Sequence, residues 1–350
     1  MRRPLIVTRD HDLLEELLRL AAAAGGEPVV AGDATEALRS WPTATVVLLG
    51  VDLVDEVAAS SPGRRGGVHL VGWGRVPDHT FRSALAVGAE NVAELPRSDA
   101  WVLEVLAEAG EGASPTGVSV GVVGGSGGSG ATTFACALAA TAALEAPACL
   151  IDADPWGPGV DRVLGLDRLQ GVRWDALQQT SGRLSARALR DSLPRRRGLG
   201  VLTWSPGPRG SLQAFAAREA LAAGTRGHAW VVLDLPRGGG TVVEDLMTRC
   251  RHLVVTVRGT VPGLSSAARF VDRAQRCGPV SVVVRGPGVD PDEVARLVGA
   301  PVIATMPDQR GLDEAVDLGL GPVRSRRSVL ARAAREALAA LAAEARGAAA

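Results

Sequence analysis

The sequence predicts two α/β domains, each built on a mainly parallel sheet. Apolar runs of strand length alternate with helical stretches over nearly the whole chain, which is typical of repeated β–α units. A segment of small residues, 108–116, interrupts this alternation. It is the expected linker between a domain of residues 1–107 and a domain of residues 117–350. A glycine-rich loop follows the first strand after the linker, as in folds that bind phosphate.

The first domain contains five expected strands with helical stretches between them. The first helical stretch carries Leu13, Leu14, Leu17 and Leu18 at helical spacing, so one of its faces is apolar. The expected strands are Leu5–Thr8, Pro28–Val30, Thr45–Leu49, Gly67–Gly72 and Asn91–Glu94.

The second domain contains seven expected strands. They lie near residues 118–123, 148–151, 199–203, 229–234, 252–257, 280–284 and 301–305. In the segment 171–198 we expect short helices followed by a turn at 194–197. A final helix from about Ser328 to Ala345 places Leu330, Ala334, Leu338 and Leu341 on one side, and we expect this stripe to pack on the domain's own sheet.

Composition excludes several classes of protein. The chain of 350 residues has 38 basic and 38 acidic side chains, so it carries no strong nucleic-acid signal. Its four cysteines contain no C-x-x-C pair, which favours a reduced, cytoplasmic setting over disulfides or zinc. The first residues read as a short strand and not as a signal peptide. No apolar run approaches the ~20 residues that span a bilayer, so at most a peripheral membrane contact is expected.

The loop after the strand 118–123 has the form of a phosphate-binding loop. Gly125 and Gly130 take the glycine positions of G-x-x-x-x-G-K-[ST], and Thr132 takes the magnesium-binding hydroxyl position. Ala131 stands where the lysine belongs, and all 38 basic residues of the chain are arginine. The predicted cofactor is ATP or ADP with Mg²⁺, held by the backbone N–H groups of the loop. The candidate binding residues are Gly125, Ser126, Gly127, Gly128, Ser129, Gly130, Ala131, Thr132 and Thr133.

Carboxylates follow two later strands. Asp152 and Asp154 come at the end of the strand 148–151, and Asp234 ends an apolar strand in the manner of a Walker B aspartate. Carboxyl ends of parallel strands meet at the edge of the sheet where phosphates bind. We therefore predict Thr132, Asp152 and Asp234 as magnesium ligands, directly or through water, and Asp154 as the catalytic residue that orients the attacking water.

These residues together resemble the MinD/ParA family of deviant Walker A ATPases, over roughly Gly117–Ala345. Within that family the likeness is to the CpaE/TadZ and septum-site-determining proteins, whose signature resembles Asp152–Asp161 followed by Leu164-Gly165-Leu166. The family loop K-G-G-x-G-K-[ST]-T falls on Ser126–Thr133, so both of its lysine positions are substituted, by Ser126 and Ala131. The base-reading asparagine that the resemblance implies is replaced by Val284-Arg285.

The missing lysine has a predictable cost. A hydrogen bond to a charged group contributes roughly 1.5–3 kcal/mol, so nucleotide affinity is expected to fall about tenfold to a hundredfold. Hydrolysis depends on positive charge in the transition state, so we expect weak or no ATP hydrolysis. In sequence, Arg237 is the nearest arginine that could replace the lysine. The competing interpretation is a glycine loop that only turns a strand into a helix.

The first domain resembles a response-regulator receiver, a flavodoxin-like fold. The resemblance lies in five β–α repeats and in the ending Val87–Pro96, with Gly-Ala before the last strand and proline after it. A working receiver needs an acidic pair, a phosphoacceptor aspartate, a Ser/Thr and a lysine. The corresponding positions read Thr8-Arg9-Asp10, Gly50, Gly72-Trp73 and Leu95, while Asp52 comes two residues too late. We therefore expect a degenerate receiver without phosphotransfer.

The resemblance implies a spatial regulator of septum placement, or of the localisation of a Tad/Flp-type pilus and secretion apparatus. It implies a homodimer formed across the face Gly124–Thr133, partners among division or pilus and secretion proteins, and action at a cell pole or septum. Two alternatives stay open: an active Mg-dependent ATPase in which arginine replaces lysine, and a nucleotide-free scaffold.

Overall fold

The computed structural model describes residues 3–110, 117–179, 184–207, 210–238, 240–286 and 288–347. The chain forms two compact units, Met1–Ser114 and Pro115–Ala350. Helix α5 (Asp99–Gly110) continues past residue 107 into the segment predicted as a linker. The other residues of that segment, 111–116, lie outside the described residues.

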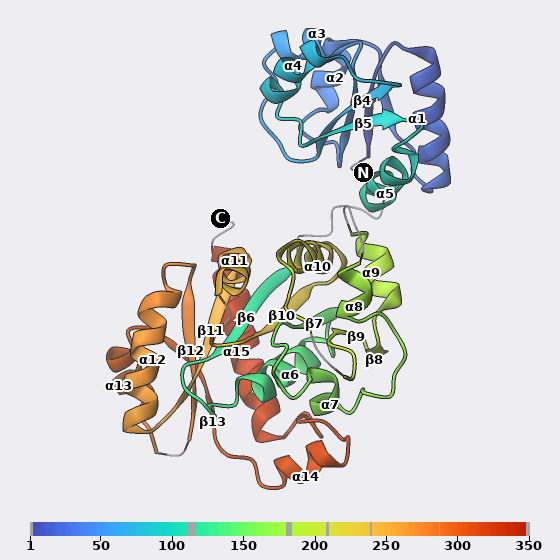
Figure 1. Cartoon of the computed structure of the whole chain (residues 1–350). Helices are drawn as coiled ribbons and strands as arrows, with labels where there is room; N and C mark the ends of the chain where they lie inside the picture. Colours follow the sequence, from blue (N-terminus) through green and yellow to red (C-terminus); the bar gives the residue numbers. More distant parts are fainter. Residues whose placement is uncertain are drawn as a thin grey trace. The chain divides into compact units, whose positions relative to one another are not determined.

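The first unit is a five-stranded parallel sheet with helices on both faces (Figure 1). The strand order β2-β1-β3-β4-β5 is that of a flavodoxin-like fold. Helices α1 and α5 cover one face of the sheet, and α2, α3 and α4 cover the other. The elements are β1 (Leu5–Val7), α1 (His11–Ala23), β2 (Val29–Ala31), α2 (Ala34–Ser40), β3 (Val47–Gly50), α3 (Val54–Ala59), β4 (Val68–Trp73), η1 (Asp78–Thr80), α4 (Phe81–Ala86), β5 (Asn91–Leu95) and α5.

Helix α1 shows how capping and apolar spacing set one element. The side chain of Asp10 accepts hydrogen bonds from the backbone N–H groups of Asp12 and Leu13, which fixes the start of the helix. Leu13 and Leu17 are fully buried, whereas Leu18 is exposed. The buried face of the helix consists of Leu13, Leu17, Leu20 and Ala21, so it is rotated away from the predicted position of Leu18.

The second unit is an eight-stranded sheet in the order β13-β12-β11-β6-β10-β7-β9-β8. Its neighbouring strands are parallel except β8, which pairs with β9 antiparallel. The prediction of a turn at 194–197 was wrong in part, because β8 takes up Arg195–Arg196 and the turn follows it. The elements are β6 (Val118–Gly124), α6 (Ala131–Ala142), β7 (Ala148–Asp152), α7 (Val160–Leu164), α8 (Trp174–Leu177), α9 (Ala186–Ser192), β8 (Arg195–Arg196), β9 (Leu199–Leu202), α10 (Ala214–Gly227), β10 (Trp230–Leu235), α11 (Gly240–Arg249), β11 (His252–Arg258), α12 (Val261–Ala274), β12 (Val280–Arg285), α13 (Pro291–Val298), β13 (Val302–Met306), α14 (Leu312–Asp317) and α15 (Val329–Gly347).

The two faces of this sheet carry separate cores. Along β6, Val120 and Val122 face the core formed with α6, α7 and α15, and Val123 faces the core formed with α10, α11 and α12. Leu330 and Leu341 of α15 are buried in the first core, which confirms the predicted packing of that helix. Within the described ranges no helix is long and apolar enough to cross a membrane.

Candidate functional site

The glycine-rich loop lies at the carboxyl end of β6, between β10 and β11 in the middle of the sheet. Two positions of the loop require glycine, one for lack of space and one for its positive φ. A Cβ on Gly125 would lie 2.8 Å from the Cβ of Ala267, and Gly130 has φ = 86°. The Oγ of Ser129 lies 2.9 Å from the Oγ1 of Thr256 and anchors the loop to β11. These three features constrain the conformation of the loop.

The loop leads directly into the amino terminus of α6, with Gly130 as the N-cap residue. The first N–H groups of a helix have no partner further back in the helix, and the helix dipole makes this end partly positive. Thr132 and Thr133 stand in the first turn, and the Oγ of Ser126 is buried without a hydrogen-bond partner among the described residues. An orphaned buried hydroxyl beside free helix N–H groups fits an anionic ligand.

The predicted binding residues differ in how far they are exposed to solvent. Gly125 and Ser129 are buried, and Gly127 and Gly128 are exposed. Partly buried are Ser126, Gly130, Ala131, Thr132 and Thr133.

The predicted carboxylates meet beside the loop. Asp152 ends β7 and Asp234 lies opposite it in β10, with Thr132 close enough to Asp234 to lower the pKa of that carboxyl. Burial, with the charge of Asp152 second, raises the pKa of Asp234 to about 8. Burial also raises the pKa of Asp152 to about 6, against hydrogen bonds from Thr203, Val160 and Asp154. Neither carboxylate forms an ion pair with a described residue, so no cation compensates the charge of Asp152, or that of Asp234 once it loses its proton.

This pair of carboxylates fits a divalent cation that is also held by other ligands. Within the described ranges, no cluster of three or more His, Cys, Asp or Glu side chains could hold a metal ion. Mg²⁺ usually binds through one or two carboxylates together with phosphate and water. Thr132, Asp152 and Asp234 are therefore the residues that would support a magnesium ion brought in with phosphates. A bound ion would supply the positive charge that the site lacks.

Asp154 sits in the turn after β7 and is partly buried. Its Oδ1 accepts a hydrogen bond of 2.9 Å from the backbone N of Trp156, and its own N–H donates to the Oδ1 of Asp152 at 3.2 Å. These bonds hold Asp154 beside the Asp152–Asp234 pair. A second acidic residue of the same segment, Asp161, is already neutralised by Arg173, whose Nη1 lies 2.8 Å from its Oδ2.

A cation that the sequence did not point to contacts the loop. The Nη1 of Arg285 donates to the carbonyl oxygen of Gly128 at 3.0 Å, and its Nε donates to the Oδ1 of Asp308 at 2.7 Å. Arg237, the nearest candidate in sequence for replacing the lysine, instead donates to the Oγ of Ser266 at 2.6 Å. The arginine beside the loop is thus the one at the end of β12, where the resemblance had implied an asparagine.

The Arg285–Asp308 pair also closes the side of the loop next to Gly130. A cavity of about 30 Å³ remains there, lined among others by Gly130, Arg285, Met306 and Asp308. That is room for only a few waters.

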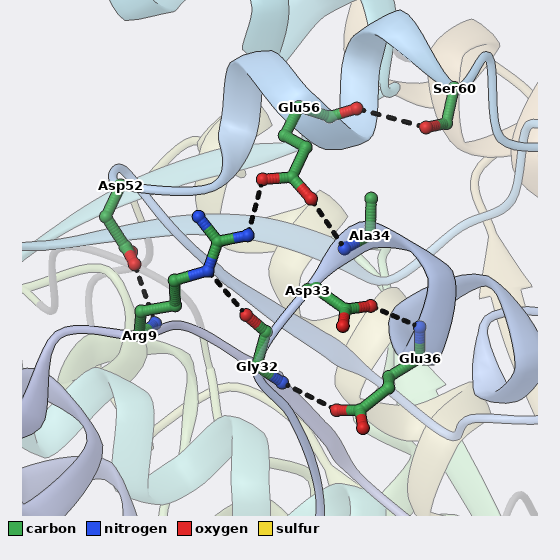
Figure 2. A network of polar contacts seen from close by, with 8 residues as sticks. All are labelled: Arg9, Gly32, Asp33, Ala34, Glu36, Asp52, Glu56 and Ser60. Atoms are coloured by element: carbon green, nitrogen blue, oxygen red, sulfur yellow. Dashed lines mark hydrogen bonds and ion pairs between the residues drawn. The ribbon is translucent and has the colours of Figure 1, made fainter.

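The receiver-like unit has a polar network where a receiver holds its metal and phosphoryl group (Figure 2). The Oγ1 of Thr8 and the backbone N of Arg9 donate to the two carboxylate oxygens of Asp52, at 2.8 and 2.7 Å. The guanidinium of Arg9 donates to Glu56 at 2.6 Å and to the carbonyl oxygen of Gly32 at 2.8 Å. The acidic residue after β1, Asp10, caps α1 instead of facing a metal.

The comparisons with known proteins divide along the same two units. Residues 7–117 match the model of the Rv3660c-like, CheY-like N-terminal domain. Over 338 residues the chain is 36% identical to the uncharacterized protein Rv3660c of Mycobacterium tuberculosis H37Rv, covering 94% of this chain and 95% of the relative. The chain belongs to the Rv3660c-like family. The likeness of the first unit to a receiver is thereby confirmed.

The second unit of this Rv3660c-like protein has the MinD/ParA fold. MinD of Aquifex aeolicus matches with a TM-score of 0.53 at 17% identity, over 65% of this chain and 97% of MinD. A ParA family ATPase of Chlorobium tepidum matches with a TM-score of 0.53 at 13% identity, over 63% and 96% of the two chains. MinD of Pyrococcus horikoshii, solved with Mg-ADP, matches with a TM-score of 0.52 at 16% identity, over 63% and 93%. At these identities the likeness establishes the fold, and the predicted fold class is confirmed.

Proposed function

We propose that this protein binds ATP or ADP with Mg²⁺ weakly at the loop 125–133 and acts as a spatial regulator with little or no hydrolysis. One observation carries the proposal: the buried carboxylates of Asp152 and Asp234 meet beside Thr132 where the loop enters α6. A glycine turn with no ligand would not need a hydroxyl, two buried carboxylates and a helix amino terminus at one point. This combination supports a loop that retains its magnesium-binding side although both lysine positions are lost.

Weak turnover follows from the charges around the loop. Ser126 and Ala131 bring no positive charge to the phosphates, and Arg285 is the cation in hydrogen-bond contact with the loop. A positive charge near the loop still attracts phosphates over several ångströms where solvent is partly excluded, which supports binding. In this proposal Asp154, whose Oδ1 accepts a hydrogen bond from the backbone N of Trp156, would orient water without a lysine to assist it. We therefore infer binding without brisk hydrolysis.

The proposed cellular role rests on the fold and on the names of relatives. MinD of Aquifex aeolicus is named as a cell division protein and has been solved in complex with MinC. By analogy we propose that this protein acts in the cytoplasm, at a cell pole or septum, in septum placement or in localising a Tad/Flp-type pilus and secretion apparatus. A homodimer across the face Gly124–Thr133 and partners from these assemblies belong to the same proposal.

Titration calorimetry of the full-length protein with Mg-ATP and Mg-ADP tests the binding step. We expect saturable binding that Asp234→Ala abolishes, because the variant removes one of the two buried carboxylates beside the loop. Asp272→Asn is the matched control, since this exposed aspartate of α12 is remote in sequence and pairs with Arg276. No heat of binding at millimolar nucleotide would overturn the proposal and leave a nucleotide-free scaffold.

One observation favours the alternative of an active ATPase. Arg285 touches the loop and could supply the charge that the lysine supplies in a working enzyme. Steady-state phosphate release separates the two functions. Turnover that depends on Mg²⁺ and disappears in Arg285→Gln would establish the enzyme, whereas binding without turnover supports the regulator.

A further inference from the structure

A groove at the opposite end of α6 from the loop has no role in the proposed function. It has a volume of about 780 Å³ and is lined by the end of α6, the end of α7, the β8–β9 hairpin and the segment 319–326. This volume lies within the range of about 300–1,000 Å³ typical of ligand pockets. Its apolar lining consists of aliphatic side chains, including Leu144, Leu164, Leu199, Leu320 and Val323.

Four arginines line the same groove: Arg196, Arg197, Arg324 and Arg326. Arg196 is held in place because its guanidinium donates to the carbonyl oxygens of Gly165 at 2.8 Å and Leu164 at 3.4 Å. The other three are exposed, and in the described part of the chain none of them forms an ion pair. The lining itself contains no aspartate or glutamate. The groove therefore combines an apolar surface with uncompensated positive charge.

The backbone conformation of Arg197 is unfavourable for a residue other than glycine, asparagine or aspartate. Arg197 and Gly198 form the two-residue turn between β8 and β9, with φ values of 48° and 84°. Such a turn favours Asn-Gly, because both residues need positive φ. A long side chain without local hydrogen bonding gains nothing from this conformation. Strain of this kind is often retained where a side chain serves a ligand, and here it sets a guanidinium at the groove.

The chemistry of the lining limits the class of ligand that the groove can bind. Arginine donates in a fork that matches carboxylate and phosphate oxygens. Apart from Ser325, the lining side chains offer no acceptor, and they include no aromatic ring or amide that could stack on a base or read its edge. Sugars and nucleosides would leave their hydroxyl and amino groups unpaired here. A straight aliphatic chain would find only aliphatic neighbours.

We propose that this groove binds a single-chain amphiphile with an anionic head, the chain lying on the leucines and the carboxylate or phosphate meeting the arginines. The ligand enters as a soluble monomer. The site does not depend on nucleotide binding at the loop 125–133, so either proposal can fail without the other.

Equilibrium binding to the full-length protein without nucleotide tests the proposal. The probes are dodecanoate and dodecyl phosphate, used below their micelle-forming concentrations; their ratio of affinities separates a carboxylate from a phosphate head. We expect saturable binding that weakens about fourfold for each methylene removed from the chain. Dodecyltrimethylammonium has the same chain and the opposite charge, and it should not bind.

Substitutions test whether the probe binds in the groove or elsewhere on the surface. Arg197→Gly should weaken binding about tenfold or more while leaving thermal stability unchanged or raised, because glycine relieves the positive φ. Arg324→Gln should weaken binding similarly. Arg276→Gln is the control, an exposed arginine of the same unit paired with Asp272. Equal binding of the cationic probe, affinities unaffected by Arg197→Gly and Arg324→Gln, or binding to anionic vesicles but not to monomers would each overturn the proposal.

Discussion

The carboxylate of Asp52 folds back over Gly50: a Cβ on Gly50 would lie 2.2 Å from the Oδ1 of Asp52. The aspartate that comes two residues late in the sequence thus occupies the space of the missing phosphoacceptor side chain. Thr8 and Arg9 hold it there by hydrogen bonds, and Figure 2 shows the one from the backbone N of Arg9. The guanidinium of Arg9 supplies positive charge to the same network through Glu56. The receiver-like unit therefore satisfies internally the groups that would otherwise bind a metal and a phosphoryl group.

This arrangement predicts an energetic coupling between positions 50 and 52. Gly50→Ala should lower the free energy of unfolding by about 1–3 kcal/mol, because the new methyl group must displace Asp52 and crowd the side chain of Thr8. The loss should be partly offset in the double variant with Asp52→Ala, with a coupling of about 1 kcal/mol. Urea unfolding of the single and double variants measures both quantities.

Gly63→Ala is the matched control for that cycle, because no atom lies within 4 Å of the added methyl group. Its free energy of unfolding should stay within about 0.5 kcal/mol of the parent. Strict additivity of Gly50→Ala and Asp52→Ala would contradict the packing of the carboxylate over Gly50.

The contact of Arg285 with the loop predicts different effects for two arginines. Arg285→Gln should lower the affinity for Mg-ADP about tenfold, since it removes the charge that touches the loop. Arg237→Gln should have no such effect, because Arg237 is bonded to Ser266 on α12. Calorimetry on the two variants measures the difference. Higher affinity in Arg285→Gln would mean that this side chain blocks the site instead of serving it.

Restoring the lysine tests whether the loop still has the geometry of a phosphate site. Ala131→Lys should raise the affinity for Mg-ATP about tenfold or more, because the new ammonium would face the phosphates. The same change should lower thermal stability slightly, since a cation at a helix amino terminus opposes the dipole by about 0.3–1 kcal/mol. Ala131→Gln adds comparable length without charge. If both variants bind alike, the loop does not hold phosphates as proposed.

Local sequence was sufficient for the loop and its carboxylates, because each strand leads directly into the residues that form the site. Asp152 and Asp234 meet since β7 and β10 are neighbours, and a parallel sheet brings strand ends together. The approach of Arg285 to Gly128 spans 157 residues and depends on the strand order β12-β11-β6. No local pattern encodes that order. Strand β8 was missed for a similar reason, since two residues carry no periodicity.

The raised pKa of Asp234 predicts that stability falls with pH. Between the ordinary aspartate pKa of about 4 and the folded value of about 8, the folded chain keeps a proton that the unfolded chain has lost. The free energy of unfolding should therefore fall as pH rises, by up to about 1.4 kcal/mol per pH unit. Asp152, with a pKa of about 6, contributes in the same direction at lower pH. Above about pH 7 Asp152 has lost its proton, and the lowered pKa values of His228 and His252 keep them neutral in the folded chain, so the decline from pH 7 to 8 reports mainly on Asp234.

Asp234→Asn should remove this decline, because the amide keeps an oxygen acceptor for Thr132 and carries no charge at any pH. Mg²⁺ should stabilise the parent more at pH 8 than at pH 6, since the ion binds the ionised carboxylate and competes with the proton. It should stabilise Asp234→Asn much less at either pH. Thermal unfolding with and without Mg²⁺ measures all three effects. A flat pH profile in the parent would mean that Asp234 is ionised in the folded chain and already has a cationic partner.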